Sequence, residues 1–186
     1  MNPHDLSAGL FVRGLTNLKG QLTKAEDHAA ASGIGEAAAL EARLAEIGRG
    51  PGHAAYSPRD LHMFTLADQI HWAAEGARLA IAQLLGARLA PTANDAKTFA
   101  ALHERIDSAI AYLREVVPSE LEYGFDRTIV IEHPRGSVRS SGGQFLVAFA
   151  IPHFFYHVTA AHSIMRNQGV PLTMGDFLGN WAGRSS

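Results

Sequence analysis

The sequence predicts an all-α fold, a single helical bundle domain spanning residues 1–186. Two observations carry this prediction. Apolar residues recur at steps of three and four along four long segments, which is typical of amphipathic helices. With 186 residues, of which 47% are hydrophobic and 18% charged, the chain also has the size and composition that form one hydrophobic core. A short extra helix and a small β-hairpin complete the predicted architecture.

Two helices are predicted in the N-terminal part. The first runs from Leu6 to Ala31 with one apolar face, and Gly33 follows as a glycine stop. The second is the short extra helix, from Glu36 to Ile47, because this stretch is rich in Ala, Leu and Glu. The glycine-rich stretch 48–52 after it is predicted to be an exposed loop.

The third and fourth helices form the middle of the predicted bundle. The third ends at Gly86, and the fourth begins after Pro91 and ends before Pro118. Each is preceded by residues that can cap a helix. These candidate caps are Ser57 and Asp60 for the third helix, and Thr92 and Asn94 for the fourth.

Between the fourth helix and the last one, the apolar residues no longer recur at steps of three and four. Residues 128–131 are β-branched and are followed by Glu132, residues 134–136 are turn-forming, and residues 137–139 follow, so a hairpin is predicted. An isolated hairpin is marginal in water, so we expect it to be the least stable part of the domain. After the last helix, residues 176–179 are expected to pack back as a short turn.

The last long helix is predicted from Gln144 to Asn167, and its apolar stripe includes His153 and His157. Both rings are therefore expected to face inward. Pro152 removes one backbone hydrogen bond, which favours a kink near His153.

Two histidines four residues apart on a helix can both reach one metal ion. The third ligand must come from another helix. His71, near the middle of the third helix, is preferred to His62, near its start, because His71 matches the depth of the pair. Three histidines with an open position would form a Lewis-acid site. Candidates for hydrogen bonds to the ligands are Asp68, Gln69 and Glu75, and His162 is expected to be structural or to support a ligand.

Composition excludes several other classes of function. The chain has no cysteine, so disulfides, thiolate ligands and a cysteine nucleophile are excluded. The formal charge of −2 provides no field to hold a nucleic acid. The N-terminus has no charged leader before an apolar core, and no apolar run reaches about 18 residues, so a cytoplasmic protein without a membrane partner is expected.

The sequence also resembles a known family over most of its length, and the C-terminal third is the most specific part of the resemblance. The segments 149–159, 164–172 and 176–179 carry a resemblance to the domain-of-unknown-function family nineteen ninety-three of the DinB/YfiT-like superfamily. The resemblance implies a DinB-like four-helix bundle, often dimeric. Many superfamily members hold a divalent metal by one histidine of the second bundle helix and a His-x-x-x-His pair of the last. The resemblance thus implies His71, His153 and His157 as ligands, and thiol-dependent transferases or isomerases as precedents.

Two hypotheses follow. The first is an enzyme that binds a small-molecule substrate and uses one Zn²⁺, Ni²⁺ or Fe²⁺ ion at His71, His153 and His157. The second is a non-catalytic homodimeric bundle or small-ligand-binding module, in which the histidines only satisfy each other in the core. The aromatic residues Phe154, Phe155 and Tyr156 are candidates for packing on the hairpin or on a second subunit.

Overall fold

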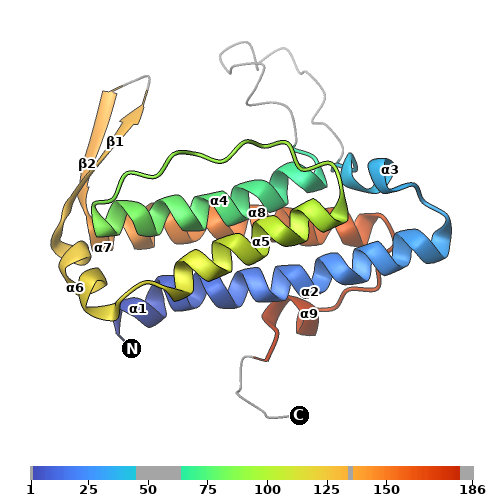
Figure 1. Cartoon of the computed structure of the whole chain (residues 1–186), viewed down its shortest axis with the longest axis horizontal. Coiled ribbons are helices and arrows are strands. Elements are labelled where there is room, and N and C mark those ends of the chain that lie inside the picture. Colours follow the sequence, from blue (N-terminus) through green and yellow to red (C-terminus); the bar gives the residue numbers. More distant parts are fainter. Residues whose placement is uncertain (1, 45–63, 134–135, 181–186) are drawn as a thin grey trace.

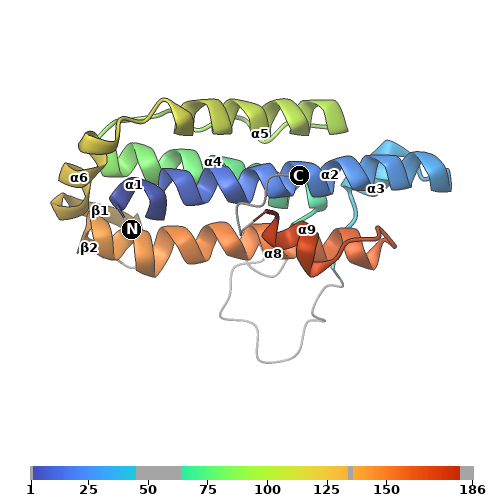
Figure 2. The same cartoon turned by 90° about the horizontal axis from the view of Figure 1, so that it is seen from below.

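Four long helices form a bundle in the computed structural model, which describes residues 2–44, 64–133 and 136–180. Figures 1 and 2 show them side by side along the long axis of the molecule. The predicted all-α bundle with a small hairpin is confirmed. The long helices are α2 (Ala8–Ser32), α4 (Leu66–Leu85), α5 (Phe99–Arg114) and α8 (Ile151–Asn167). The short helices are α1 (Pro3–Leu6), α3 (Glu36–Leu40), α6 (Pro118–Asp126), α7 (Gly142–Phe145) and α9 (Met174–Leu178).

The observed ends of the helices confirm some of the predicted helix boundaries and correct others. Gly33 and Gly86 end α2 and α4 in the left-handed conformation, as predicted. The start of α4 lies later than predicted, because its N-cap is Thr65. The Thr65 hydroxyl accepts the Asp68 N–H, and the Asp68 carboxylate accepts the Thr65 N–H, which completes a capping box. Ser57, Asp60, His62, the glycine-rich loop at 48–52 and residues 134–135 of the hairpin turn lie outside the described residues.

The start of α5 also differs from the prediction. Residues 87–97 are not helical and run along the bundle as an extended strap (Figure 1), and Thr98 caps α5. Thr92 and Asn94, the predicted caps, instead bond to Glu75 and Asp68 of α4. Tertiary contacts with α4 therefore override the local capping signal of these two side chains.

Two short helices depart from the sequence prediction. α3 ends at Leu40 and residues 41–44 are not helical, whereas the predicted end at Ile47 lies outside the described residues. α6 is absent from the prediction, in which Pro118 only ends the preceding helix. Proline lacks the N–H that a first helical residue leaves unbonded, so Pro118 also begins α6.

The hairpin lies at one end of the bundle (Figure 1) and confirms the prediction. Strand β1 (Thr128–His133) pairs antiparallel with β2 (Gly136–Ser141), with Ile131 opposite Val138. Ile129 is buried in the bundle core, whereas Val138 is exposed. The hairpin is thus held to the helices by its first strand.

The last helical segment begins before α8 and contains a wide turn. α7 is capped by Ser141, and a π-helical turn, η3 (Leu146–Ala150), joins α7 to α8. Pro152 cannot donate a backbone hydrogen bond, and its ring would crowd the carbonyl of Ala148 in a regular helix. The wider π turn relieves this crowding directly before Pro152.

One helix of the described residues, Gly142–Asn167, is long and apolar enough by composition to cross a membrane, and 44% of its most apolar window is buried. A core helix of a soluble bundle meets the same criterion, and this helix packs along α4. The predicted cytoplasmic location stays a prediction.

Candidate metal centre

His153 and His157 lie one turn apart on α8, where it packs against α4. Their Nε2 atoms are 3.3 Å apart. Two nitrogen ligands about 2.1 Å from one tetrahedral ion are about 3.4 Å apart, so the pair has the spacing of two ligands of one ion. His157 is buried and His153 is half-buried. The pair is therefore open on the side of His153.

Gln69 of α4 orients His157. The Gln69 carbonyl Oε1 lies 2.7 Å from His157 Nδ1 and accepts its proton. This hydrogen bond places the proton on Nδ1 and leaves the Nε2 lone pair directed toward His153. A ligating histidine in a metal site is commonly held by such a bond at its other nitrogen.

Gly76 of α4 makes room for His153. A Cβ atom at position 76 would lie 3.0 Å from His153 Nδ1, which is tighter than ordinary contact. Phe149 also stacks on His153, at a centroid distance of 5.5 Å and an interplanar angle of 20°. The imidazole therefore contacts both the backbone of α4 at Gly76 and an aromatic ring of its own helical segment.

Burial keeps both rings neutral near pH 7. It lowers the pKa of His157 to about 4, and the neighbouring His153 and His71 add to the effect. Burial also lowers the pKa of His153. Metal ligation requires neutral imidazole, so the electrostatics of the site fit a cation.

His71, the predicted third ligand, is placed differently. It is two residues from Gln69, about 200° around α4, although it is close enough to His157 for its charge to lower the pKa of that residue. The charged groups that act on its pKa are Arg105, Glu75, Asp68 and Asp95, although burial is the main cause of its lowered pKa. Within residues 2–44, 64–133 and 136–180, no three His, Cys, Asp or Glu side chains form a group that could hold a metal. The structure thus brings His153 and His157 together but does not bring His71 to them.

The other candidates for hydrogen bonds to the ligands serve the fold. Asp68 caps α4, and Glu75 bonds to Arg78 and Thr92. His162 Nδ1 lies 2.8 Å from Gln21 Oε1, which joins α8 to α2. Of the candidates named from the sequence, only Gln69 bonds to a histidine of the pair.

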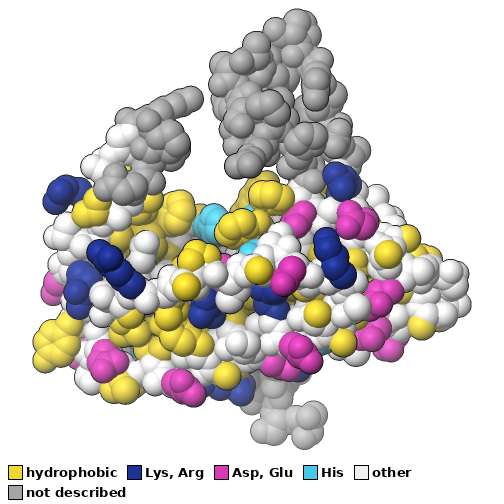
Figure 3. Space-filling view, turned by 45° about the horizontal axis from the view of Figure 1, so that its top comes forward, with side chains coloured by type: hydrophobic (Ala, Val, Ile, Leu, Met, Phe, Trp, Pro, Cys, Tyr) yellow, Lys and Arg dark blue, Asp and Glu magenta, His cyan; other side chains and the backbone are white. Residues whose placement is uncertain are grey.

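Sequence reasoning missed the aromatic surroundings of the pair. Phe149 precedes His153 by four residues, the same step that joins His153 to His157, so its stacking was readable from the spacing. Phe64 lies beside His157 at 6.1 Å, a contact between distant segments that no local pattern indicates. Figure 3 shows histidine side chains at the surface between two groups of hydrophobic side chains.

The chain is similar to one family and to a solved structure. It matches the Domain of unknown function (DUF1993) family over residues 4–178. It also resembles the crystal structure of a DinB family member protein from Shewanella denitrificans, with a TM-score of 0.79 and 28% identity over 98% of this chain and 95% of that chain. No curated protein matches this chain.

Proposed function

The chain belongs to the DUF1993 family and has the DinB-like bundle, and from this premise we propose that it is a divalent-metal-dependent enzyme. His153 and His157 hold the ion through their Nε2 atoms. The observation that supports this most directly is the 3.3 Å separation of these atoms, together with the bond from Gln69 that fixes the tautomer of His157. The pair thereby has the spacing, the neutral rings and the orienting partner that metal-ligating histidines require.

A bound Zn²⁺, Ni²⁺ or Fe²⁺ ion would supply Lewis-acid chemistry, stabilising a thiolate or polarising a carbonyl oxygen. The residues of this chain have separate roles around it. His157 is the buried, oriented ligand, and His153 is the half-exposed ligand beside which a substrate can approach. Thiol-dependent transfer or isomerisation is the reaction class that the superfamily resemblance supports. His71, the third ligand expected from the sequence, is not part of the proposed two-histidine site and has a separate test below.

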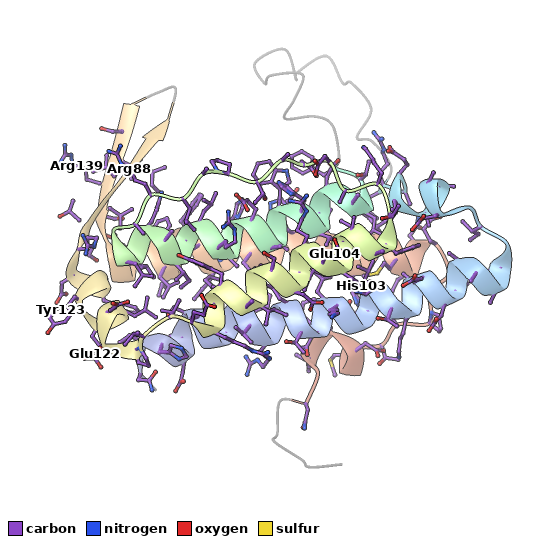
Figure 4. All side chains as sticks on the ribbon, in the orientation of Figure 1. Arg88, His103, Glu104, Glu122, Tyr123 and Arg139 are labelled. Carbon is purple, nitrogen blue, oxygen red and sulfur yellow. The ribbon has the colours of Figure 1, made fainter. Side chains whose placement is uncertain are left out.

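The test is metal content and zinc affinity of protein purified without a histidine tag. We expect about one ion per chain in the wild type, and loss of that ion in His153→Ala and His157→Ala. His103→Ala is the matched control, because His103 lies on α5 (Figure 4) and is 3.4 Å from Glu26 of α2, whereas the pair lies on α8. The control removes one imidazole from the same protein and should keep the ion.

A wild-type protein that contains no metal and rejects added zinc, nickel and iron would contradict the proposal. The His153 N–H would then donate to His157 Nε2 as an ordinary hydrogen bond, which is the non-catalytic bundle of the second hypothesis. The homodimer expected from the sequence remains a proposal as well, and light scattering at several protein concentrations measures it.

A further inference from the structure

A cavity of about 520 Å³ lies between α4, the strap at 87–97 and α5. Its lining includes no residue of α8, so the cavity is separate from the histidine pair. Sites for small molecules in proteins usually have volumes of about 300–1,000 Å³. The cavity is therefore large enough to enclose a small organic ligand.

Alanines leave this space open and give the cavity an apolar floor. Five of the lining residues are alanines, whose side chains are too short to fill the gap between the three segments. Among them, Ala74, Ala96 and Ala109 are buried, and Ala101 is half-buried. A hydrocarbon group that covers these methyl groups would be removed from water, which favours binding.

The two arginines that line the cavity are each paired with a carboxylate of the same lining. Buried Glu75 lies 3.2 Å from Arg78 and also accepts hydrogen bonds from the backbone and hydroxyl of Thr92. Arg105 donates to the same hydroxyl and lies 3.0 Å from Asp95. These contacts join the strap to both helices, so the wall of the cavity is formed before a ligand binds.

Glu104 is the remaining charged residue of the lining. It lies on α5 (Figure 4), is exposed, and has no hydrogen bond or ion pair within residues 2–44, 64–133 and 136–180. Because Glu75 and Asp95 already offset the two arginines, the charge left over in the cavity is the negative charge of Glu104. A cavity with one uncompensated carboxylate attracts a cation and repels an anion.

We propose that this cavity binds a small organic amine, whose ammonium group donates hydrogen bonds to the Glu104 carboxylate while its hydrocarbon part covers the alanine floor. The exposure of Glu104 places the charged contact at the mouth of the cavity, and the burial of Ala74 and Ala109 places the apolar contact at its floor. The ligand class is thus a primary amine with a compact apolar body, rather than a carboxylic acid. Binding requires no metal, so its test is independent of the proposed metal-dependent function.

Three probes with one phenylethyl skeleton test this proposal. 2-Phenylethylamine carries an ammonium group at pH 7, 3-phenylpropionate carries a carboxylate, and 2-phenylethanol carries a neutral hydroxyl. Ligand-observed NMR titrations of the chelator-treated wild-type protein at low salt should show that the amine binds more tightly than the alcohol, and the carboxylate most weakly. Glu104→Gln should weaken the amine about twofold to fivefold, the range of an exposed ion pair, and leave the alcohol unchanged.

Matched substitutions outside the cavity are the controls. Glu122→Gln removes an exposed carboxylate from α6 at the end of the bundle (Figure 4) and should leave the amine affinity unchanged. Ala101→Leu extends a side chain of the lining into the cavity and should weaken the amine and the alcohol alike. Ala111→Leu makes the same change at an exposed position of α5 outside the lining and should weaken neither. Circular dichroism melts verify that the variants are folded.

Four outcomes overturn the proposal. A wild-type protein that does not bind the amine lacks the proposed site. Tighter binding of the carboxylate would mean that the arginines select the ligand, and equal binding of the amine and the alcohol would mean that no charge does. An amine affinity that Glu104→Gln leaves unchanged would also contradict the proposal, whether or not Ala101→Leu lowers that affinity. Because zinc is absent from these titrations, none of the four outcomes bears on the histidine pair, whose own test is metal content.

Discussion

The two sides of α4 satisfy their polar groups in different ways. Toward α5, the buried Glu75 carboxylate accepts hydrogen bonds from Arg78 and from the backbone and hydroxyl of Thr92. Arg105 reaches the same hydroxyl and pairs with Asp95 at 3.0 Å. This charged network borders a cavity of about 520 Å³. Toward α8, Gln69, His157 and His153 form a hydrogen-bonded chain without a formal charge.

The polar groups on the α5 side of α4 stabilise the fold, whereas those on its α8 side are arranged to bind a proton or a cation. In the charged network each ion has an opposite charge close by, and the network ties the strap at 87–97 to α4 and α5. Glu75 is the buried member of this network, so its removal leaves the Arg78 and Thr92 donors without their buried acceptor. In the neutral chain two imidazole nitrogens face one another, and one hydrogen atom or one cation can occupy the space between them. The α5 side is therefore expected to govern stability, and the α8 side metal binding.

The largest expected effect comes from breaking the charged network. Glu75→Ala should lower the free energy of unfolding by about 3–5 kcal/mol, because a buried partner of an ion pair is removed. Urea denaturation at pH 7 measures it. Glu75→Gln keeps an oxygen that accepts the Thr92 N–H and should cost less.

Glu104→Ala is the control for this experiment, since Glu104 lines the same cavity but is exposed. Its effect should stay within about 0.5 kcal/mol, as for ordinary surface substitutions. If Glu75→Ala is as mild as Glu104→Ala, the proposed division between the two sides of α4 is wrong.

The two sides of α4 are also expected to contribute to stability over different pH ranges. Folded His157 has a pKa of about 4, whereas an unfolded histidine titrates near 6.5, so between these values the unfolded chain binds more protons. The free energy of unfolding should therefore fall as the pH is lowered from about 6.5 to about 4, by about 3 kcal/mol from this residue. The pKa of Glu75 is lowered too, so its contribution is present above about 4.5 and is lost as the pH falls below that value.

His157→Asn isolates the histidine contribution, because His71, His153 and His162 also have lowered pKa values and shift stability in the same direction. Urea denaturation from pH 4 to 8 should give a shallower slope for the variant than for the wild type. Equal slopes would show that His157 is not protonated differently in the two states.

Much of the fold was predictable because its signals are local. Gly33 and Gly86 end helices in a conformation that glycine adopts without strain, and the β-branched run in residues 128–131 forms a strand. Thr65 with Asp68 is also a readable capping pattern, but Ser57 and Asp60 offered the same chemistry earlier in the chain. A cap is chosen by where the helix packs, which a local pattern does not contain.

The candidate site was predictable in part for the same reason. The step of four residues that relates His153 to His157 is local and places both on one face. The choice of His71 used depth along the bundle, whereas the direction of a side chain depends on the helix angle. Gln69 lies at the angle around α4 that faces His157. A shift of two positions along α4, to His71, turns the side chain from the neutral chain toward the charged network.

A smaller effect, on zinc affinity, is expected from a substitution at Gly76, which contacts His153 on the α8 side of α4. Gly76→Ala adds a Cβ atom 3.0 Å from His153 Nδ1, so the ring must shift by a few tenths of an ångström. Zinc affinity should fall about tenfold, equal to about 1.4 kcal/mol, when measured by calorimetry. Gly20→Ala in α2 is the control, because a Cβ atom there meets nothing within 4 Å. Both variants gain helix propensity, so only a steric effect at His153 distinguishes them.

The smallest effect on metal binding is expected at His71, the residue for which sequence and structure diverge. His71 lies on the side of the charged network, and its Nδ1 is buried without a hydrogen-bond partner. His71→Ala should change zinc affinity by less than about twofold, since burial lowers the pKa of His71 and keeps it neutral near pH 7, and it acts on His157 through its charge. Its stability should fall through lost burial, so affinity is measured per folded molecule. A loss of zinc as large as in His153→Ala would mean that α4 turns His71 toward α8 when metal binds, and the separation of the two sides would then hold only without metal.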